Sequence, residues 1–260
     1  TIIASFQTGA VSYLYYADRV YQINLAIAGI AVGTVSLPVL SKAFKTKNVK
    51  KISNIQNKSF ELSLLFSIPA SFGLIFASNE IVNALFGYGS FSLKDVEMTA
   101  AALKFFGYGV PAFALIKILS NFFFARDNTK TPFYISIFIV LLNIMISVGF
   151  FNKIGFIIIP IATSISTWIG VFVYIYLLNS KKILLLKNQL MINFIKILIS
   201  TIIMSAILLL SLDRFSNYLN YNYNYKAIYL ITIVSFVGMF YLLSCYLFGL
   251  LKLKNYKTNL

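Results

Sequence analysis

Runs of apolar residues, separated by short polar segments, follow one another along almost the whole chain. A helix needs about 20 such residues to cross the hydrocarbon core of a bilayer. The stretches that reach this length are residues 11–43, 57–86, 97–125, 132–151, 155–178, 190–212 and 226–251. Residues 1–8 resemble the end of an earlier span. The runs are much longer than the alternating ten-residue segments of a membrane barrel, so we expect an all-α integral membrane protein.

Basic residues indicate which ends of these predicted spans face the cytoplasm. The segment SKAFKTKNVKKISNIQNK carries six lysines and no acid, and ARDNTKTP, NSKKILLLKNQ and the C-terminal LKLKNYKTNL are also basic. The loops between these segments have fewer basic residues or balance them with acids. Basic loops favour the cytoplasmic side of a membrane. We therefore expect a cytoplasmic C-terminus and place the turn near residues 8–12 outside.

The composition also indicates a lipid environment. Hydrophobic residues make up 59% of the 260 residues and charged residues only 11%, whereas a soluble domain is about 25% charged. A net charge of +15 would suggest nucleic acid as the partner of a soluble protein. Lysines that lie between apolar runs fit anionic lipid head groups better. We expect membrane lipids as partners, and no nucleic acid.

Several kinds of chemistry are disfavoured by what the sequence lacks. The chain has no histidine, the residue most used for acid–base catalysis and metal binding. Cys245 stands alone inside an apolar run, so no intrachain disulfide can form. The sequence contains no GxxxxGK[ST] motif, and its seven acids form no hydrolase-like pair. We expect neither enzymatic activity nor a cofactor.

Proline and glycine residues interrupt several of the predicted spans. The prolines that fall inside apolar runs are Pro38, Pro69, Pro111 and Pro160. Each would remove a backbone hydrogen bond and tend to kink its helix. Thr131 and Pro132 instead fit the N-cap and first position of a helix. Gly29 and Gly33 form a small-xxx-small face that lets another helix approach closely, and packing is the simplest interpretation of these features.

The first predicted span carries a polar face. Its members share the i, i+3, i+4, i+7 spacing of one side of a helix, and they are Ser12, Tyr15, Tyr16, Arg19, Gln22 and Ile23. Counted from residue 11, Arg19 lies about 12 Å along the helix, too deep for a short snorkel. Asp18 lies about 100° from Arg19 around the helix. Two interpretations remain: either the face lines water, or Asp18 and Arg19 form an ion pair that holds two helices together.

A second cation approaches the membrane midplane from the opposite side. Lys117, in ALIKILSNFFFARD, precedes Arg126 by nine residues, or about 13 Å of helix. Two cations on different helices suggest an anionic cargo. Alternatively, Lys117 faces protein and neutralises a carboxylate. Lys104, Lys196 and Glu61 lie closer to the ends of their spans, so we expect them to snorkel.

The segments that carry these charges resemble one known family. SYLYYADRVYQ, followed by AIAGIAVGTVSLPVLSKAF, resembles the eighth transmembrane segment of the MurJ (MviN) lipid II flippases of the MOP exporter superfamily. ALFGYGSFS is similar to the link after the family's ninth helix, and KILSNFFFARDNTKTP to the end of its tenth. Order and spacing agree along essentially the whole chain.

The resemblance implies the second lobe of a two-lobe bacterial inner-membrane transporter. Residues 1–178 would run from the end of helix seven to helix twelve, and residues 179–260 would form two additional helices and a basic cytoplasmic tail. The chain begins with Thr1 and has no signal-peptide pattern, so we expect a fragment that lacks its N-terminal lobe. The family moves lipid II, an undecaprenyl-diphosphate-linked muropeptide, to the outer leaflet by alternating access during cell-wall synthesis.

The resemblance also implies roles for single residues. Arg19 would hold the lipid diphosphate in a cationic central cavity, together with Asp18 and Lys117, because a guanidinium binds phosphate bidentately. The residues that would line this cavity are Ser12, Tyr15, Tyr16 and Gln22. A groove that involves the last two helices would accept the polyprenyl tail. Some members bind sodium through Asn and Asp four residues apart; Asn143 fits, but Ser147 takes the partner position, which disfavours sodium.

Two other functions remain open at this point. Another MOP-type exporter would carry drugs or lipid-linked oligosaccharides, and a drug exporter would need aromatic and acidic cavity residues rather than Arg and Lys. A non-transporting scaffold would bind other membrane proteins of wall synthesis, and it would not need charges at mid-depth. The mid-depth cations therefore favour a lipid II flippase.

Overall fold

The computed structural model describes residues 3–251, and this part of the chain contains helices and no strand. The first pass joins α1 (Ala10–Leu25), the π-helical η2 (Ala26–Ala31) and α2 (Val32–Lys45). The other long helices are α3 (Val49–Phe76), α5 (Leu93–Phe124), α6 (Lys130–Ile154), α7 (Ile158–Ser180), α8 (Asn188–Arg214) and α9 (Lys226–Leu247). The short helices are η1 (Ala4–Phe6), α4 (Ser78–Phe86), η3 (Gly155–Ile157) and η4 (Ser216–Tyr218).

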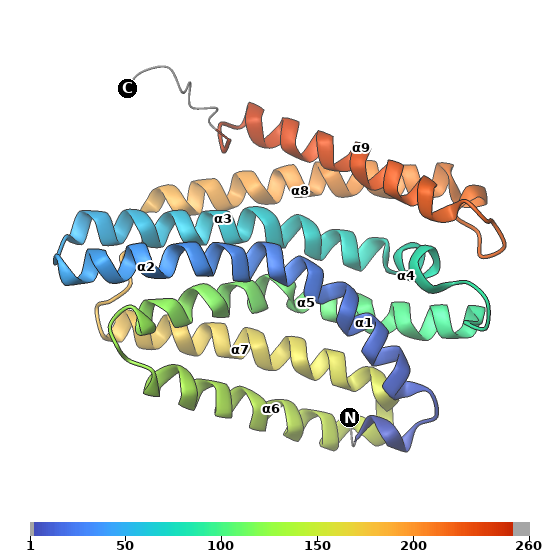
Figure 1. Ribbon diagram of the computed structural model, residues 1–260, viewed down its shortest axis with the longest axis horizontal. Helices are drawn as coiled ribbons and strands as arrows, with labels where there is room; N and C mark the ends of the chain where they lie inside the picture. Colours follow the sequence, from blue (N-terminus) through green and yellow to red (C-terminus); the bar gives the residue numbers. More distant parts are fainter. Residues whose placement is uncertain (1–2, 252–260) are drawn as a thin grey trace.

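The seven predicted spans are confirmed as seven helical passes. Six helical stretches of the described chain are long and apolar enough to cross a membrane. The longest of them, Lys130–Ser180, comprises α6 and α7, which run antiparallel (Figure 1). Gly155 divides them with φ 73°, a conformation that glycine adopts without strain. The protein is therefore an all-α membrane protein, as the apolar runs predict.

Helix α5 lies at the centre of the bundle and contacts α1, α2, α3, α4 and α7. Helix α6 packs on the outer side of α7, at the lower edge of Figure 1. On the opposite edge α8 packs against α3, and α9 lies over α8. The chain thus forms a bundle of α1 to α7 with the α8–α9 pair attached along α3.

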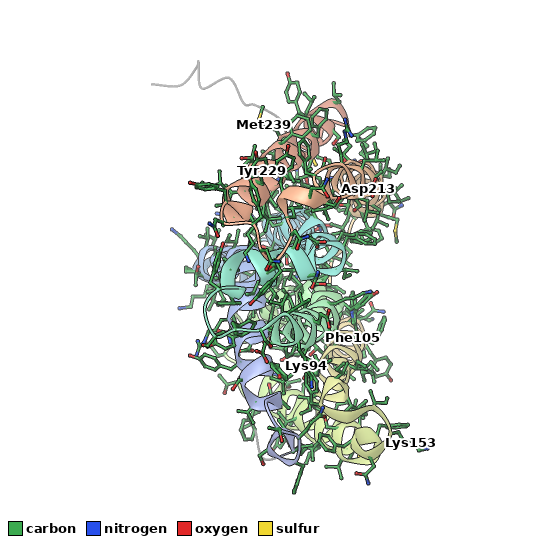
Figure 2. All side chains as sticks on the ribbon, turned by 90° about the vertical axis from the view of Figure 1, so that its right-hand side faces the viewer. Lys94, Phe105, Lys153, Asp213, Tyr229 and Met239 are labelled. Carbon is green, nitrogen blue, oxygen red and sulfur yellow. The ribbon has the colours of Figure 1, made fainter. Side chains whose placement is uncertain are left out.

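The basic segments gather at one end of this bundle. The α2–α3, α5–α6 and α7–α8 connections lie together at the left of Figure 1, near the C-terminal end of α9. Most of the fourth basic segment, LKLKNYKTNL, lies outside the described residues. Figure 2 looks onto the other end, where Lys94, Lys153 and Asp213 lie near the ends of three separate helices, α5, α6 and α8. The lysine pattern of the sequence therefore corresponds to one basic end of the bundle and one end with fewer basic residues.

Two predictions about helix ends are wrong in detail. Residues 57–86 are not one span, because α3 begins at Val49 and is followed after Ala77 by the separate α4. Asn48 sets this early start, since its side-chain oxygen accepts a 2.9 Å hydrogen bond from the amide of Lys51. Helix α6 begins at Lys130 with Thr129 at its N-cap, two residues before the predicted cap.

The prolines divide into two groups. Those inside helices are Pro38, Pro69 and Pro111, as predicted. Pro160 was expected inside a span, but it is the third residue of α7. Pro132 likewise is the third residue of α6. In the first turn of a helix the amide has no intrahelical acceptor, so neither proline costs a hydrogen bond.

Gly29 and Gly33 bring the first pass close to α5, as the small-xxx-small pattern predicts. A Cβ atom on Gly29 would lie 3.1 Å from the Cα of Ala114. The carbonyl of Gly33 accepts a 2.8 Å hydrogen bond from the side-chain amide of Asn121. The contact centres on η2, a π-helical segment that the sequence did not indicate. Glycine is needed here because the two backbones almost touch.

Lys226 attaches the start of α9 to the loop after α4. Its side chain is only 1% exposed, and its Nζ donates 2.6 Å hydrogen bonds to the carbonyls of Gly87 and Tyr221. The ammonium lies 4.3 Å from the ring centroid of Tyr88 and 4.7 Å from that of Tyr221. No carboxylate within residues 3–251 pairs with it. Carbonyl dipoles and aromatic faces stabilise this buried cation instead.

The α8–α9 pair is also fixed at the basic end. The side chain of Gln56 donates to the carbonyl of Ile183 and accepts from the amide of Leu185, both at 3.0 Å, so the α7–α8 loop is held on α3. Lys196 was expected to snorkel, but its Nζ donates 2.8 Å to the carbonyl of Phe248 after α9. Carbonyls at a helix C-terminus attract a cation, which explains this partner.

The other two residues expected to snorkel behave differently from each other. Lys104 is exposed on α5. Glu61 is half-buried and pairs with Lys58 on the same helix at 3.6 Å. This i,i+3 pair is the one ion pair found within residues 3–251, and such pairs stabilise a helix by about 0.2–0.5 kcal/mol.

The two glycines of the first pass should differ in tolerance. Gly29→Ala places a methyl group against the Ala114 backbone, and overpacking of this kind costs about 1–3 kcal/mol. The nearest atom to a Cβ at Gly33 is the side-chain nitrogen of Asn121, at 3.3 Å, which can shift. We expect Gly29→Ala to lower the thermal unfolding midpoint more than Gly33→Ala in the same detergent. An equal or larger loss at Gly33 would contradict this account.

Removal of the Lys226 ammonium should loosen α9. Lys226→Met keeps the apolar stem but leaves two buried carbonyls without a donor, at a cost of about 2–3 kcal/mol. We expect a lower unfolding midpoint and faster proteolysis of the α8–α9 loop. Lys94→Met is the matched control, because Lys94 is exposed at the same end. If both variants unfold like the wild type, Lys226 does not hold α9 in place.

Candidate functional site

The polar face of α1 is open in the structure. Its exposed residues are Ser12, Tyr15, Arg19, Gln22 and Ile23. Tyr16 is half-buried, whereas Ala17 and Val20 on the opposite side are buried. The helical spacing therefore identified an exposed face in the N-terminal half of the first pass.

Asp18 and Arg19 do not pair with each other. Asp18 accepts a hydrogen bond from the side-chain amide of Gln22, one helical turn further along. The Arg19 guanidinium lies over the ring of Tyr15, one turn back, with its Cζ 4.8 Å from the ring centroid. Within residues 3–251 Arg19 forms no ion pair. The described structure therefore gives no support to an Asp18–Arg19 staple, and it leaves the guanidinium N–H groups available.

Aromatic side chains from two other segments support this face. The Tyr16 ring packs against Phe86 of α4 and Phe91 of the α4–α5 loop, with centroid separations of 4.8 and 5.3 Å. Tyr21 stacks on Phe106 and Phe113 of α5, at 4.8 and 5.3 Å. Sequence reasoning missed these partners. Phe86 and Phe91 lie in ALFGYGSFS, but helical spacing alone cannot bring them to Tyr16.

One hydrogen bond fixes the N-terminal end of α1 to α5. The hydroxyl of Tyr13 donates to the carboxylate of Asp95 at 2.9 Å. Asp95 is the third residue of α5 and forms a capping box with Ser92. A capping box satisfies backbone groups at the start of a helix and holds the carboxylate in place. The N-terminal end of α1 is therefore held at a fixed position on α5.

Lys117 and Asn143 line one pocket, whose surface is mostly apolar. The pocket has a volume of about 410 Å³ and is bounded by Leu25 and by residues of α5, α6 and α7. Its polar lining is Lys117, Ser136, Asn143, Thr163, Ser166 and Thr167. The side-chain amide of Asn143 donates 2.9 Å to Thr163. Two predicted site residues are thus brought together, whereas Arg19 is not among the residues that line this pocket.

The pocket around Asn143 does not fit a sodium ion. Hard cations prefer carboxylate and carbonyl oxygens, but the lining of the pocket includes no Asp or Glu and does include Lys117. Like charges at this depth repel strongly. Ser147 is buried, and its hydroxyl has no hydrogen-bond partner within the described residues. The donor set therefore agrees with the sequence in disfavouring sodium.

Two further pockets border the α8–α9 pair. An apolar groove of about 470 Å³ runs between the two helices, and its lining includes Phe215, Ile228, Tyr229 and Phe236; Tyr229 is labelled in Figure 2. A polar pocket of about 400 Å³ lies beside the α8–α9 loop and includes Glu80 and Asn83. Burial raises the pKa of the Glu80 carboxyl.

No cluster of three or more acidic, Cys or His side chains that could hold a metal is found within residues 3–251.

Comparison with known proteins gives one consistent family. A family profile described as lipid II flippase MurJ matches residues 1–230. The probable lipid II flippase MurJ of Rickettsia prowazekii is 36% identical over 262 residues, which cover 99% of this chain and 50% of that protein. That of Rhizobium meliloti is 39% identical over 170 residues, covering 65% of this chain and 32% of that protein.

A solved structure gives the same result. The lipid II flippase MurJ in an inward closed conformation matches with a TM-score of 0.76 at 30% identity. The match covers 94% of this chain and 48% of that structure. The chain spans about half the length of the curated relatives that match it along its whole length.

Proposed function

The chain belongs to the family of the lipid II flippase MurJ, and we propose that it forms the second half of a lipid II flippase. The complete transporter would move the lipid from the inner to the outer leaflet by alternating access during cell-wall synthesis. The observation that carries this proposal is the open polar face of α1, where Arg19 has no carboxylate partner within the described residues. An uncompensated cation in a membrane span needs an anionic partner.

The two parts of the chain would have different tasks. Residues 1–178 would form the second lobe around the cavity, and residues 179–260 the two additional helices and the tail. The attachment of α8 and α9 along α3, away from α1, supports this division. The apolar groove between α8 and α9 would accept the polyprenyl tail. The N-terminal lobe of the same protein would cover the exposed face of α1.

Arg19 would bind the diphosphate of the lipid. A guanidinium presents N–H groups in a planar fork that matches two phosphate oxygens. Asp18 would not neutralise it, because its carboxylate accepts from Gln22 instead. Lys117 would add a second positive charge deeper in the membrane, and Ser12, Tyr15, Tyr16 and Gln22 would line the cavity. In this arrangement the residues of the cavity would bind and orient the lipid, and the rocking of the two lobes would move it between leaflets.

The family assignment also bears on location. MurJ relatives and apolar helices support a multi-pass membrane protein of a bacterial inner membrane. We place the basic end of the bundle, with the C-terminus, in the cytoplasm, because basic loops favour that side. Flippases transport their substrate and do not transform it, so the family is not one of enzymes. The partners would be lipid II and membrane lipids.

Two other functions are less well supported. A multidrug exporter would use acidic and aromatic cavity residues, but the face of α1 presents an arginine whose acidic neighbour is bound elsewhere. An exporter of lipid-linked oligosaccharides would share the anionic diphosphate, so only transport assays with both lipids separate it from a lipid II flippase. A scaffold would not need Arg19 at this depth.

Arg19 variants of the full-length protein test the proposed site. Loss of a charge-assisted hydrogen bond worth about 1.5–3 kcal/mol should weaken diphosphate binding roughly 10- to 150-fold in Arg19→Ala. Arg19→Lys keeps the charge but loses the fork, so it should be intermediate. Complementation of a flippase-depleted bacterium and abundance in the membrane are measured together, with Arg214→Ala as the exposed control.

The outcomes of this test are distinct. Normal abundance with lost complementation supports substrate binding by Arg19. Low abundance of Arg19→Ala, with abundance and growth restored by Asp18→Asn, would instead make the arginine a structural partner. Full complementation by Arg19→Ala would remove Arg19 from the site.

Single cysteines test the orientation. After Cys245 is replaced by alanine, cysteines at Lys47 and Lys182 should resist a membrane-impermeant thiol reagent in intact spheroplasts. A cysteine at Asn217, in the α8–α9 connection at the opposite end, should be labelled. Labelling at Lys47 in sealed cells would reverse the orientation.

A further inference from the structure

Arg19 is held by an aromatic ring and not by an acid. Within residues 3–251 it forms no ion pair, and its neighbour Asp18 is bound to Gln22. A free arginine side chain would sample many rotamers on an exposed helix face. Among the described residues, the contact that restricts the guanidinium is the ring of Tyr15, 4.8 Å from its Cζ.

We infer that Tyr15 is a positioning residue that aims the Arg19 guanidinium at the lipid diphosphate, an inference that rests on the proposed function. A cation over the face of a tyrosine is attracted by the negative charge of the π system. Contact with a ring needs none of the five N–H donors of the guanidinium, so these donors remain for another partner. A carboxylate partner would bind that edge and compete with the phosphate oxygens.

The spacing of Tyr15 and Arg19 along α1 favours this contact in any regular helix. Tyr15 and Arg19 are four residues apart, and side chains with this spacing meet on one face of a helix. Side chains also tilt toward the N-terminus of a helix, which directs Arg19 back over Tyr15. Asp18 and Gln22 form a second pair with the same spacing. Two parallel i,i+4 pairs therefore keep the adjacent charges apart.

Other elements support the Tyr15 ring in turn. Tyr15 is 54% exposed, and its ring meets that of Tyr16 edge to face, at 5.9 Å and 77°. Tyr16 packs between Phe86 and Phe91. The loop that carries Phe91 is fixed from the other side, because Tyr221 donates 2.6 Å to the Phe91 carbonyl. The position of the guanidinium is thus linked to α4 and to the α8–α9 loop.

Binding of undecaprenyl diphosphate to the full-length protein in nanodiscs tests this inference. Tyr15→Phe keeps the ring and should bind like the wild type, whereas Tyr15→Leu should weaken binding roughly 2- to 30-fold. In an Arg19→Ala background Tyr15→Leu should have no further effect, because the two residues act as one unit. Tyr176→Leu, on an exposed tyrosine of α7, is the matched control.

Each other result has one meaning. If Tyr15→Phe loses as much affinity as Tyr15→Leu, the hydroxyl and not the ring is needed, and the inference is wrong. Full additivity of Tyr15→Leu and Arg19→Ala would mean that Tyr15 contacts the lipid independently, and it would also overturn the inference. Unchanged binding by Arg19→Ala alone would instead refute the proposed diphosphate site.

Discussion

The close contact between η2 and α5 is the constraint on which the candidate site depends. At Gly29 the two backbones are near van der Waals contact, and the aliphatic stem of Lys117 lies beside the same glycine. The contact fixes the rotation of the first pass about its axis, and this rotation decides which residues of α1 are exposed. The glycine face turned toward α5 and the polar face turned outward are therefore two results of one packing arrangement.

Charge separation within α1 follows from helix geometry. Adjacent residues on a helix point about 100° apart, so Asp18 and Arg19 each meet a different partner four residues away. Had they paired, the membrane span would hold a nearly neutral dipole. Because Asp18 binds Gln22 and Arg19 lies over Tyr15, the positive charge stays accessible on the open face. Local backbone geometry thus provides the accessible positive charge on which the proposed diphosphate site depends.

Features that depend on local order could be predicted from the sequence, and features that depend on tertiary contacts could not. Apolar runs and lysine spacing gave seven passes and one basic end, and helical spacing gave the exposed face with Tyr15 and Arg19. The separation of α4 from α3, the partners of Lys226 and the packing of Phe86 and Phe91 on Tyr16 require contacts across the bundle. Lys196 is an example. A lysine at this depth can either snorkel to the membrane surface or bind a carbonyl at the end of another helix, and the sequence does not show that it binds the Phe248 carbonyl.

The attachment made by Lys226 has an evolutionary consequence. Its ammonium hydrogen-bonds to main-chain carbonyls of Gly87 and Tyr221, which every amino acid supplies. The hydrogen bonds themselves do not depend on the residue types at these two positions. Other contacts do constrain them, because the Tyr221 ring also contacts the ammonium and a Cβ atom at Gly87 would lie too close to the side-chain oxygen of Asn83. Other positions in these two connections can therefore change while α9 keeps its place, provided that Lys226 and the groups that contact it are retained.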